Sequence, residues 1–147
     1  MSATTSKLRT PVLIDPRGPR FGAGITTIVL AVVLVTGNPW VLAVQAVVFG
    51  LGALIGLSAQ PYGVVFRRFV RPRLAPPSVL EEAAPPRFAQ AVGLLFALVA
   101  LAGAAADITL LTTVAVAMAL GAAFLNAAFD FCLGCEMYVL GQRFLAR

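Results

Sequence analysis

The chain has 147 residues, of which 60% are hydrophobic and only 12% are charged, and its mean hydropathy is +0.94. Soluble domains average about 25% charged residues, because charged side chains cover the surface that faces water. The composition therefore excludes a water-soluble domain and predicts a surface that faces lipid. The chain contains no histidine, which excludes Ser-His-Asp and Cys-His catalysis and any histidine-ligated zinc or haem site.

Eleven Lys and Arg residues against six Asp and Glu residues give a formal charge of +5. A basic charge can indicate nucleic-acid binding, but such modules carry it on one face of a soluble domain. Here the basic residues flank long apolar runs. We therefore expect membrane lipid as a partner, and no nucleic acid.

The apolar runs predict four membrane-spanning helices. A helix needs about 20 apolar residues to cross a bilayer core of about 30 Å. No residue is charged between Phe21 and Phe66, which is too long for one span, and the turn signal Gly37-Asn38-Pro39 divides this stretch. Two further runs follow Arg87 and Asp107. We predict an all-α membrane domain over residues 21–147, with spans at about 21–36, 39–58, 88–106 and 108–129.

The distribution of Lys and Arg predicts the orientation of these spans. All eleven lie in the N-terminal segment 1–20, the loop 59–87 or the tail after residue 129, and the two short turns have none. Because basic residues are retained on the cytoplasmic side, we expect a multi-pass protein of the bacterial inner membrane with that loop and both termini in the cytoplasm. A cleaved signal peptide is the alternative for the first span, but the apolar character continues past any plausible cleavage site.

The segments before the first and third spans resemble each other. Asp15-Pro-Arg-Gly-Pro-Arg20-Phe21 and Glu82-Ala-Ala-Pro-Pro-Arg87-Phe88 both place an acid five residues before an Arg-Phe pair. This similarity predicts two tandem helical hairpins that turn near Gly37 and Gly103, an arrangement known from transport proteins. The alternative is that Pro, Arg and Phe are general choices where a helix enters a membrane.

Two patterns predict local structure. Small residues recur every fourth position at Ala115, Ala119, Ala123 and Ala127, and again at Gly52 and Gly56, so we expect helices to pack closely there. In the loop, residues 64–71 mix apolar and basic side chains, which suggests a segment at the membrane interface. The capping-box spacing of Ser78 and Glu81 predicts one short helix.

The two cysteines form one motif, Cys132-Leu133-Gly134-Cys135. Positions three apart on a helix are neighbours at about 5–6 Å, within the range that a disulfide can bridge. The predicted topology places the motif at the cytoplasmic boundary. In this reducing compartment, a cycling dithiol or a metal site is more usual than a structural disulfide.

Three interpretations of Cys132 and Cys135 stay open. In the first they are a catalytic redox pair, in which one cysteine attacks as a thiolate and the other resolves the mixed disulfide. Asp130, Glu136 and the end of the fourth helix all disfavour that thiolate. This objection weakens if a new helix starts at the motif, or if Arg143, Arg67 or Arg68 folds back over it. In the second, the cysteines bind a metal with Asp130 and Glu136, or with the cysteines of a second copy. In the third they only pack.

Three segments carry a resemblance to a known family: Asp15–Phe21, Pro85–Gln90 and Phe131–Tyr138. Together they resemble a family of uncharacterised bacterial membrane proteins described only as a domain of unknown function. The F-C-x-G-C-x-x-Y pattern is the most specific part, and the resemblance covers most of the chain after about Val12. Members of such families lie beside thioredoxin-like and sulfurtransferase genes, which implies a role in thiol or sulfur metabolism but supplies no reaction.

These observations favour a dithiol protein that exchanges thiols or sulfur with a soluble thioredoxin-like or sulfurtransferase partner. No cofactor is expected, and whether the protein is an enzyme stays open. One alternative is a non-enzymatic membrane subunit or scaffold with dispensable cysteines. Another is a small carrier for a sulfur compound, which requires a homo-oligomer because a single four-helix bundle has little room for a pathway.

Overall fold

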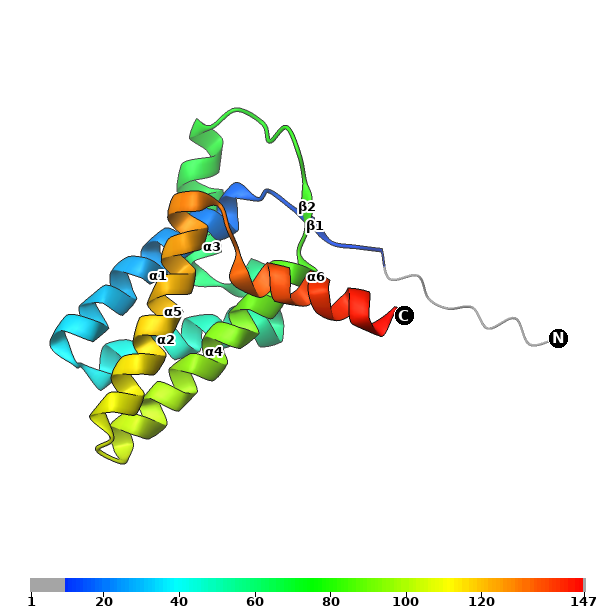
Figure 1. The fold of residues 1–147 in the computed structure, drawn as a ribbon. Helices are drawn as coiled ribbons and strands as arrows, with labels where there is room; N and C mark the ends of the chain where they lie inside the picture. Colours follow the sequence, from blue (N-terminus) through cyan, green and yellow to red (C-terminus); the bar gives the residue numbers. More distant parts are fainter. Residues whose placement is uncertain (1–9, 147) are drawn as a thin grey trace.

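The computed structural model describes residues 10–146, and most of this part of the chain is helical (Figure 1). Four helices form a bundle, and the C-terminal helix runs across it. Within these residues the strands are one two-residue pair, so the prediction of an all-α fold is confirmed. The bundle comprises α1 (Arg17–Thr36), α2 (Pro39–Gly50), α4 (Ala84–Ala105) and α5 (Thr109–Phe129), and the crossing helix is α6 (Leu133–Leu145).

Among the described residues, α1, α4 and α5 are long and apolar enough to cross a membrane. Helix α2 has 12 residues and continues into a π-helical turn of 5, η1 (Leu51–Ile55). Gly56 then adopts a φ of 141°, which only glycine takes readily, and ends the helix before the predicted boundary at Ser58. The resulting length is about 26 Å, slightly less than the bilayer core. The structure therefore shows three candidate spans and one shorter apolar helix.

Both predicted turns lie at the same end of the bundle, and they differ in detail (Figure 1). The first is as expected: Gly37 ends α1 with a φ of 66°, and the side chain of Asn38 accepts a hydrogen bond that caps α2. In the second, Asp107 adopts the positive φ, 58°. Gly103 lies inside α4, where a Cβ would come within 2.7 Å of Thr112 Oγ1. Gly103 is therefore a close-packing residue and not the turn residue that the sequence suggested.

The segment between α2 and α4 is a series of short helical turns. They begin after Gly56 and continue through the region expected at the membrane interface. Phe66 is buried there, with its ring centroid 5.7 Å from that of Phe21 on α1, so this segment is folded back onto the bundle. The turns are η2 (Leu57–Ala59), α3 (Pro61–Val65), η3 (Phe66–Val70) and η4 (Arg71–Arg73).

The helix predicted after Ser78 is not formed. Glu81–Glu82 instead make strand β2, which pairs antiparallel with β1 (Leu13–Ile14), Leu13 opposite Glu82. Ala83 N–H also donates to the carbonyl of Val12, at 2.8 Å. The prediction was wrong because the chain before α1 supplies backbone partners that a capping-box pattern cannot reveal. The two segments that lead into α1 and α4 therefore lie side by side.

Asp15 fixes the start of α1. Its carboxylate accepts hydrogen bonds from Arg17 N, at 3.0 Å, and from Arg17 Nη2, at 2.8 Å, and the side chain is buried. The hydrogen bond from the Arg17 side chain is the main cause that lowers the pKa of Asp15 from its usual value. Arg17 Nη2 also donates to the carbonyl of Ala75, which ties the loop to the start of the helix.

The bundle core contains mainly small and aliphatic side chains. Helix α5 packs against α1 and α4, and α4 packs against α2. The alanine pattern is confirmed as a packing face at Ala115, which is buried, and at Ala119, which contacts the core. Gly52 is buried beneath the side chain of Gln90, as its spacing predicted, whereas Gly56 ends a helix. In the small-residue patterns, therefore, some positions pack closely against another helix, whereas Gly56 has a different role.

Arg20 and Arg87, the two equivalent arginines of the repeated segments, cap helices of opposite hairpins. Arg20 Nε, at the start of α1, donates to the carbonyl of Ala127 near the end of α5, at 3.0 Å. Arg87, at the start of α4, donates from Nε to Ala53 O at 2.8 Å and from Nη2 to Leu54 O at 3.0 Å. Carbonyl groups at a helix end have no partner within the helix. Each arginine therefore supplies donors that the other hairpin lacks.

We expect Arg87→Ala to lower the free energy of unfolding by about 1–2 kcal/mol, because the carbonyls of Ala53 and Leu54 lose charged donors. Arg73→Ala is the matched control, since Arg73 is exposed in the preceding loop. Unfolding of the purified proteins in detergent measures both effects. Equal losses of stability in the two variants would contradict this role for Arg87.

Candidate functional site

The cysteine pair lies at the beginning of a helix. Helix α5 ends at Phe129, close to the predicted boundary, and Asp130 follows it with a left-handed φ of 54°. Cys132 is the N-cap residue of α6, which starts at Leu133. The motif therefore does not extend the C-terminal end of α5, and the arrangement that the sequence left as an alternative, a new helix at the motif, is the one observed.

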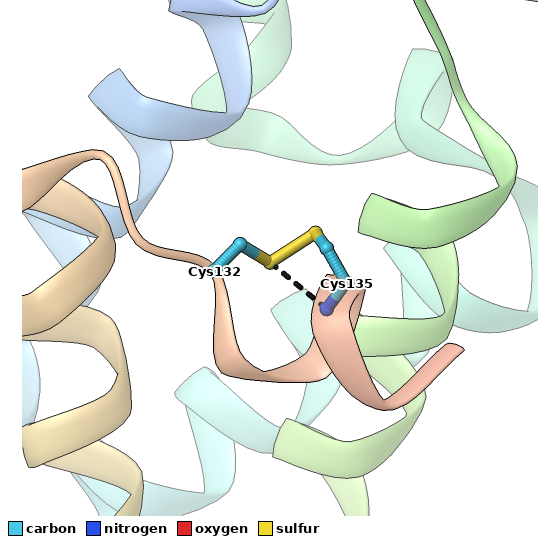
Figure 2. Close-up of a disulfide and its surroundings, with 2 residues drawn as sticks. All are labelled: Cys132 and Cys135. Carbon is cyan, nitrogen blue, oxygen red and sulfur yellow. Dashed lines mark hydrogen bonds between the residues drawn. A yellow bond between two sulfur atoms is a disulfide. The ribbon is translucent and has the colours of Figure 1, made fainter. Parts of the chain in front are cut away.

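Cys132 and Cys135 are joined by a disulfide, with their Cα atoms 5.2 Å apart (Figure 2). The backbone N–H of Cys135 donates a hydrogen bond to Cys132 Sγ, at 3.2 Å. This bond is drawn as the dashed line in Figure 2. The sulfur of Cys132 thus caps the first turn of α6, in the place where a hydroxyl or carboxylate oxygen usually caps a helix.

The charges around the pair act in opposite directions. The N-terminus of α6 carries partial positive charge and favours a thiolate on Cys132, and the hydrogen bond from Cys135 N–H adds to this effect. Glu136 lies in the first turn of the same helix, and exposed Asp130 lies two residues before Cys132. Both carboxylates disfavour a thiolate, but water screens them because their side chains are exposed. The fold fixes the position of the α6 N-terminus, so the effect of its backbone on a Cys132 thiolate does not depend on mobile side chains.

Helix α6 is seated on the start of α4 by a close contact. A Cβ built on Gly134 would come within 2.6 Å of both Cα and Cβ of Ala89. Further along α6, the ring of Tyr138 lies 5.7 Å from the ring of Phe88. The glycine inside the C-x-x-C motif is therefore required where the two helices touch, and it holds the cysteine pair against the bundle.

A cavity of about 270 Å³ lies beside the pair, and Cys132 is part of its wall. The cavity is bordered by α1, α2, α4, α5 and the start of α6, and Cys135 does not line it. Its polar lining residues are Thr26, Gln90 and Asn126. Sequence reasoning missed these three residues. Each is an uncharged polar residue within a long apolar run, and that pattern was the available signal.

Two buried glutamines, Gln45 and Gln60, lie near the cavity, and sequence reasoning missed these as well. Gln45 on α2 is fully buried, and its Oε1 accepts a hydrogen bond from Tyr62 Oη at 2.7 Å. Gln60 Nε2 donates to Gln90 Oε1, also at 2.7 Å. The amide nitrogen of Gln45 has no partner among the described residues. Tyr62, in α3, therefore bonds to a buried polar group.

No group of three Cys, Asp or Glu side chains within residues 10–146 is placed to hold a metal ion. In particular, the structure does not bring Asp130 and Glu136 together with Cys132 and Cys135 into such a group. The alternative metal site, formed by the cysteines of two copies of the chain, needs a second copy, and the structure contains a single chain.

The comparisons with known proteins identify a family and nothing closer. No curated protein and no solved structure matches the chain. One family model matches residues 14–143, which includes both arginine-containing segments and the cysteine motif. The resemblance expected from those segments is thereby confirmed, and the chain belongs to the family described as Domain of unknown function (DUF4395).

Proposed function

We propose that this protein is a membrane-bound dithiol protein whose Cys132 and Cys135 exchange electrons with a soluble thioredoxin-like partner. The observation that carries the proposal is the position of the disulfide at the N-terminus of α6. Reactive cysteines are commonly found at helix N-termini, where the thiolate is the favoured form. A purely packing role gives no reason for Cys132 Sγ to occupy the capping position.

The exchange has two steps. In the reduced protein, the Cys132 thiolate attacks a disulfide of the partner, an S–S bond to Cys132 forms, and the partner releases one thiolate. Cys135 then loses its proton and attacks Cys132 Sγ, which forms the Cys132–Cys135 disulfide and releases the second partner thiolate. Two electrons pass from the dithiol to the partner, and two protons follow. The reverse sequence oxidises the partner.

Capture of the partner by Cys135→Ser tests this proposal, because the variant removes the resolving thiol and leaves the attacking one. The fully wild-type chain resolves the mixed disulfide and is expected to capture little. Absence of any disulfide-linked partner from both single variants would favour the alternatives, a membrane subunit or a carrier.

For the membrane topology, we propose four crossings of the bacterial inner membrane with both termini in the cytoplasm. Helix α2 with η1 makes the fourth crossing, since 17 residues is the lower limit of length for a span and the bilayer thins locally around short spans. The basic residues of the loop and of α6 lie away from the two short turns, in agreement with the positive-inside rule. Lys7, Arg9 and Arg147, which the same prediction used, lie outside the described residues.

We expect Cys132 and Cys135, after reduction, to react with a membrane-impermeant maleimide from the cytoplasmic side only. Inverted and right-side-out vesicles provide the two sides, and mass spectrometry counts the labelled thiols. A chain with Asn38→Cys and both native cysteines replaced by serine is the control, because residue 38 lies in a turn at the opposite end of the bundle. Labelling of the native pair from the outside would overturn the orientation.

A further inference from the structure

The cavity beside Cys132 has the features of a ligand site. Its volume, about 270 Å³, is close to the lower end of the range for small-molecule pockets, which is about 300 Å³. It therefore has room for a single ring with small substituents and not for a nucleotide. Met118, which is 55% exposed on α5, also lines it, so the cavity reaches the outer surface of the bundle. A long apolar tail has a way out toward lipid there.

The chemistry of the wall selects a neutral ligand. No residue that lines the cavity carries a charge, and most are aliphatic or aromatic. An ion in such a site would lose its hydration without gaining a counter-charge, which is strongly unfavourable. Ionised sulfur compounds and phosphorylated cofactors are therefore poor ligands. The hydroxyl and carboxamide groups of Thr26, Gln90 and Asn126 are instead suited to neutral carbonyl or hydroxyl oxygens.

One of these polar groups has a free donor. Gln90 Oε1 accepts a hydrogen bond from Gln60 Nε2, which fixes the orientation of the Gln90 amide. Its own Nε2 donates to no partner among the described residues. An amide N–H in an apolar cavity is a favourable partner for a carbonyl oxygen of a ligand. The ligand therefore needs to be largely apolar, to be about the size of a single ring, and to carry carbonyl groups.

We propose that this cavity binds the head group of a membrane quinone, and that the Cys132–Cys135 dithiol reduces it. The inference rests on the dithiol function proposed above and supplies its second redox partner. Cys132, the cysteine in the cavity wall, faces the quinone, and Cys135, which lies outside the wall, resolves the intermediate.

The reaction is balanced by the two thiols. The Cys132 thiolate adds to a ring carbon of the quinone, and one ring oxygen takes up a proton. Cys135, as a thiolate, attacks Cys132 Sγ, so that the S–S bond forms, the C–S bond breaks and its electron pair stays on the ring. The second ring oxygen then takes up a proton. One dithiol becomes one disulfide, and one quinone becomes one quinol, with the two protons that left the thiols.

The test uses the reduced full-length protein in lipid nanodiscs and a benzoquinone with a decyl tail. We expect two thiols to be lost for each quinone that is reduced. The fall in quinone absorbance measures the number of quinones reduced. Ala122→Leu places a larger side chain into the cavity wall and is expected to slow this reaction at least tenfold. Ala117→Leu, on an exposed position of the same helix that does not line the cavity, is expected to leave the rate within twofold.

Each rate is divided by the rate at which the same reduced variant reduces 5,5′-dithiobis(2-nitrobenzoate), a soluble and strongly oxidising disulfide, which corrects for misfolded protein. Equal normalised rates for Ala122→Leu and Ala117→Leu would overturn the cavity as the site. If the wild-type dithiol exchanges with the soluble disulfide and is not oxidised by the quinone, the quinone inference fails while the proposed function stands. If it reacts with neither, the proposed function fails as well.

Discussion

A chain that carries Cys135→Ser will hold a partner protein through a disulfide to Cys132, and a chain that carries Cys132→Ser will hold at least tenfold less. The reason lies in the hydrogen bond to Cys132 Sγ, which comes from the backbone N–H of residue 135 and so survives the substitution. An N–H that donates to Cys132 Sγ favours the thiolate of that residue over its thiol, so Cys132 is the cysteine that we expect to attack. Cys135 has no such donor among the described residues.

The measurement is a non-reducing gel of acid-quenched membranes, followed by mass spectrometry of the species that dithiothreitol releases. The double variant, with both cysteines replaced by serine, is the control for nonspecific association. Equal capture by the two single variants would show that the helix N-terminus does not select the attacking cysteine. A captured protein without a redox-active cysteine would count against a thioredoxin-like partner.

Gly134→Ala is expected to displace α6 from α4, although it adds a single methyl group. The new Cβ would meet Cα and Cβ of Ala89, so the start of α6 has to move because no flexible side chain is there to yield. Overpacking of this kind costs about 1–3 kcal/mol. Since Cys132 and Cys135 flank this contact, we also expect thiol exchange with the partner to slow at least tenfold.

Gly141→Ala is the matched control for this prediction. Gly141 lies in the same helix, and a Cβ there would meet nothing within 4 Å. Alanine at an open helical position is expected to stabilise α6 by about 0.5–1 kcal/mol. Thermal unfolding in detergent and the exchange rate are measured on both variants. If Gly134→Ala behaves like Gly141→Ala, the contact with Ala89 does not position the cysteine pair.

The features predicted correctly from the sequence are those that depend on residues close to one another in the sequence. Apolar runs between charges predicted α1, α4 and α5, and the Gly37-Asn38-Pro39 signal predicted the first turn. The spacing of Cys132 and Cys135 predicted that they are close enough for a disulfide. Each of these properties follows from backbone geometry over a few residues, so no knowledge of the tertiary structure is needed.

The features that could not be predicted depend on contacts between distant segments. Glu81 and Glu82 form a strand because Leu13 and Ile14 lie beside them, and a local pattern cannot show this. Gly103 was assigned to a turn, but its neighbour Thr112 belongs to the next helix. The cavity is a further example, since its wall is built from helices that are separate in the sequence. The redox role of the cysteines is still a prediction.

The reciprocal arginine caps also have a consequence for synthesis, because each cap joins a donor and an acceptor that are made at different times. When α2 and η1 first emerge from the ribosome, the carbonyls of Ala53 and Leu54 lack their donor, because Arg87 follows more than 30 residues later. Arg20 is made early, but its acceptor at Ala127 is 107 residues away. These carbonyls of the N-terminal half therefore stay uncapped until Arg87 has been made, and the end of α5 is capped only when it reaches Arg20. Either half of the chain alone would keep helix-end carbonyls that only the arginine of the other half can cap.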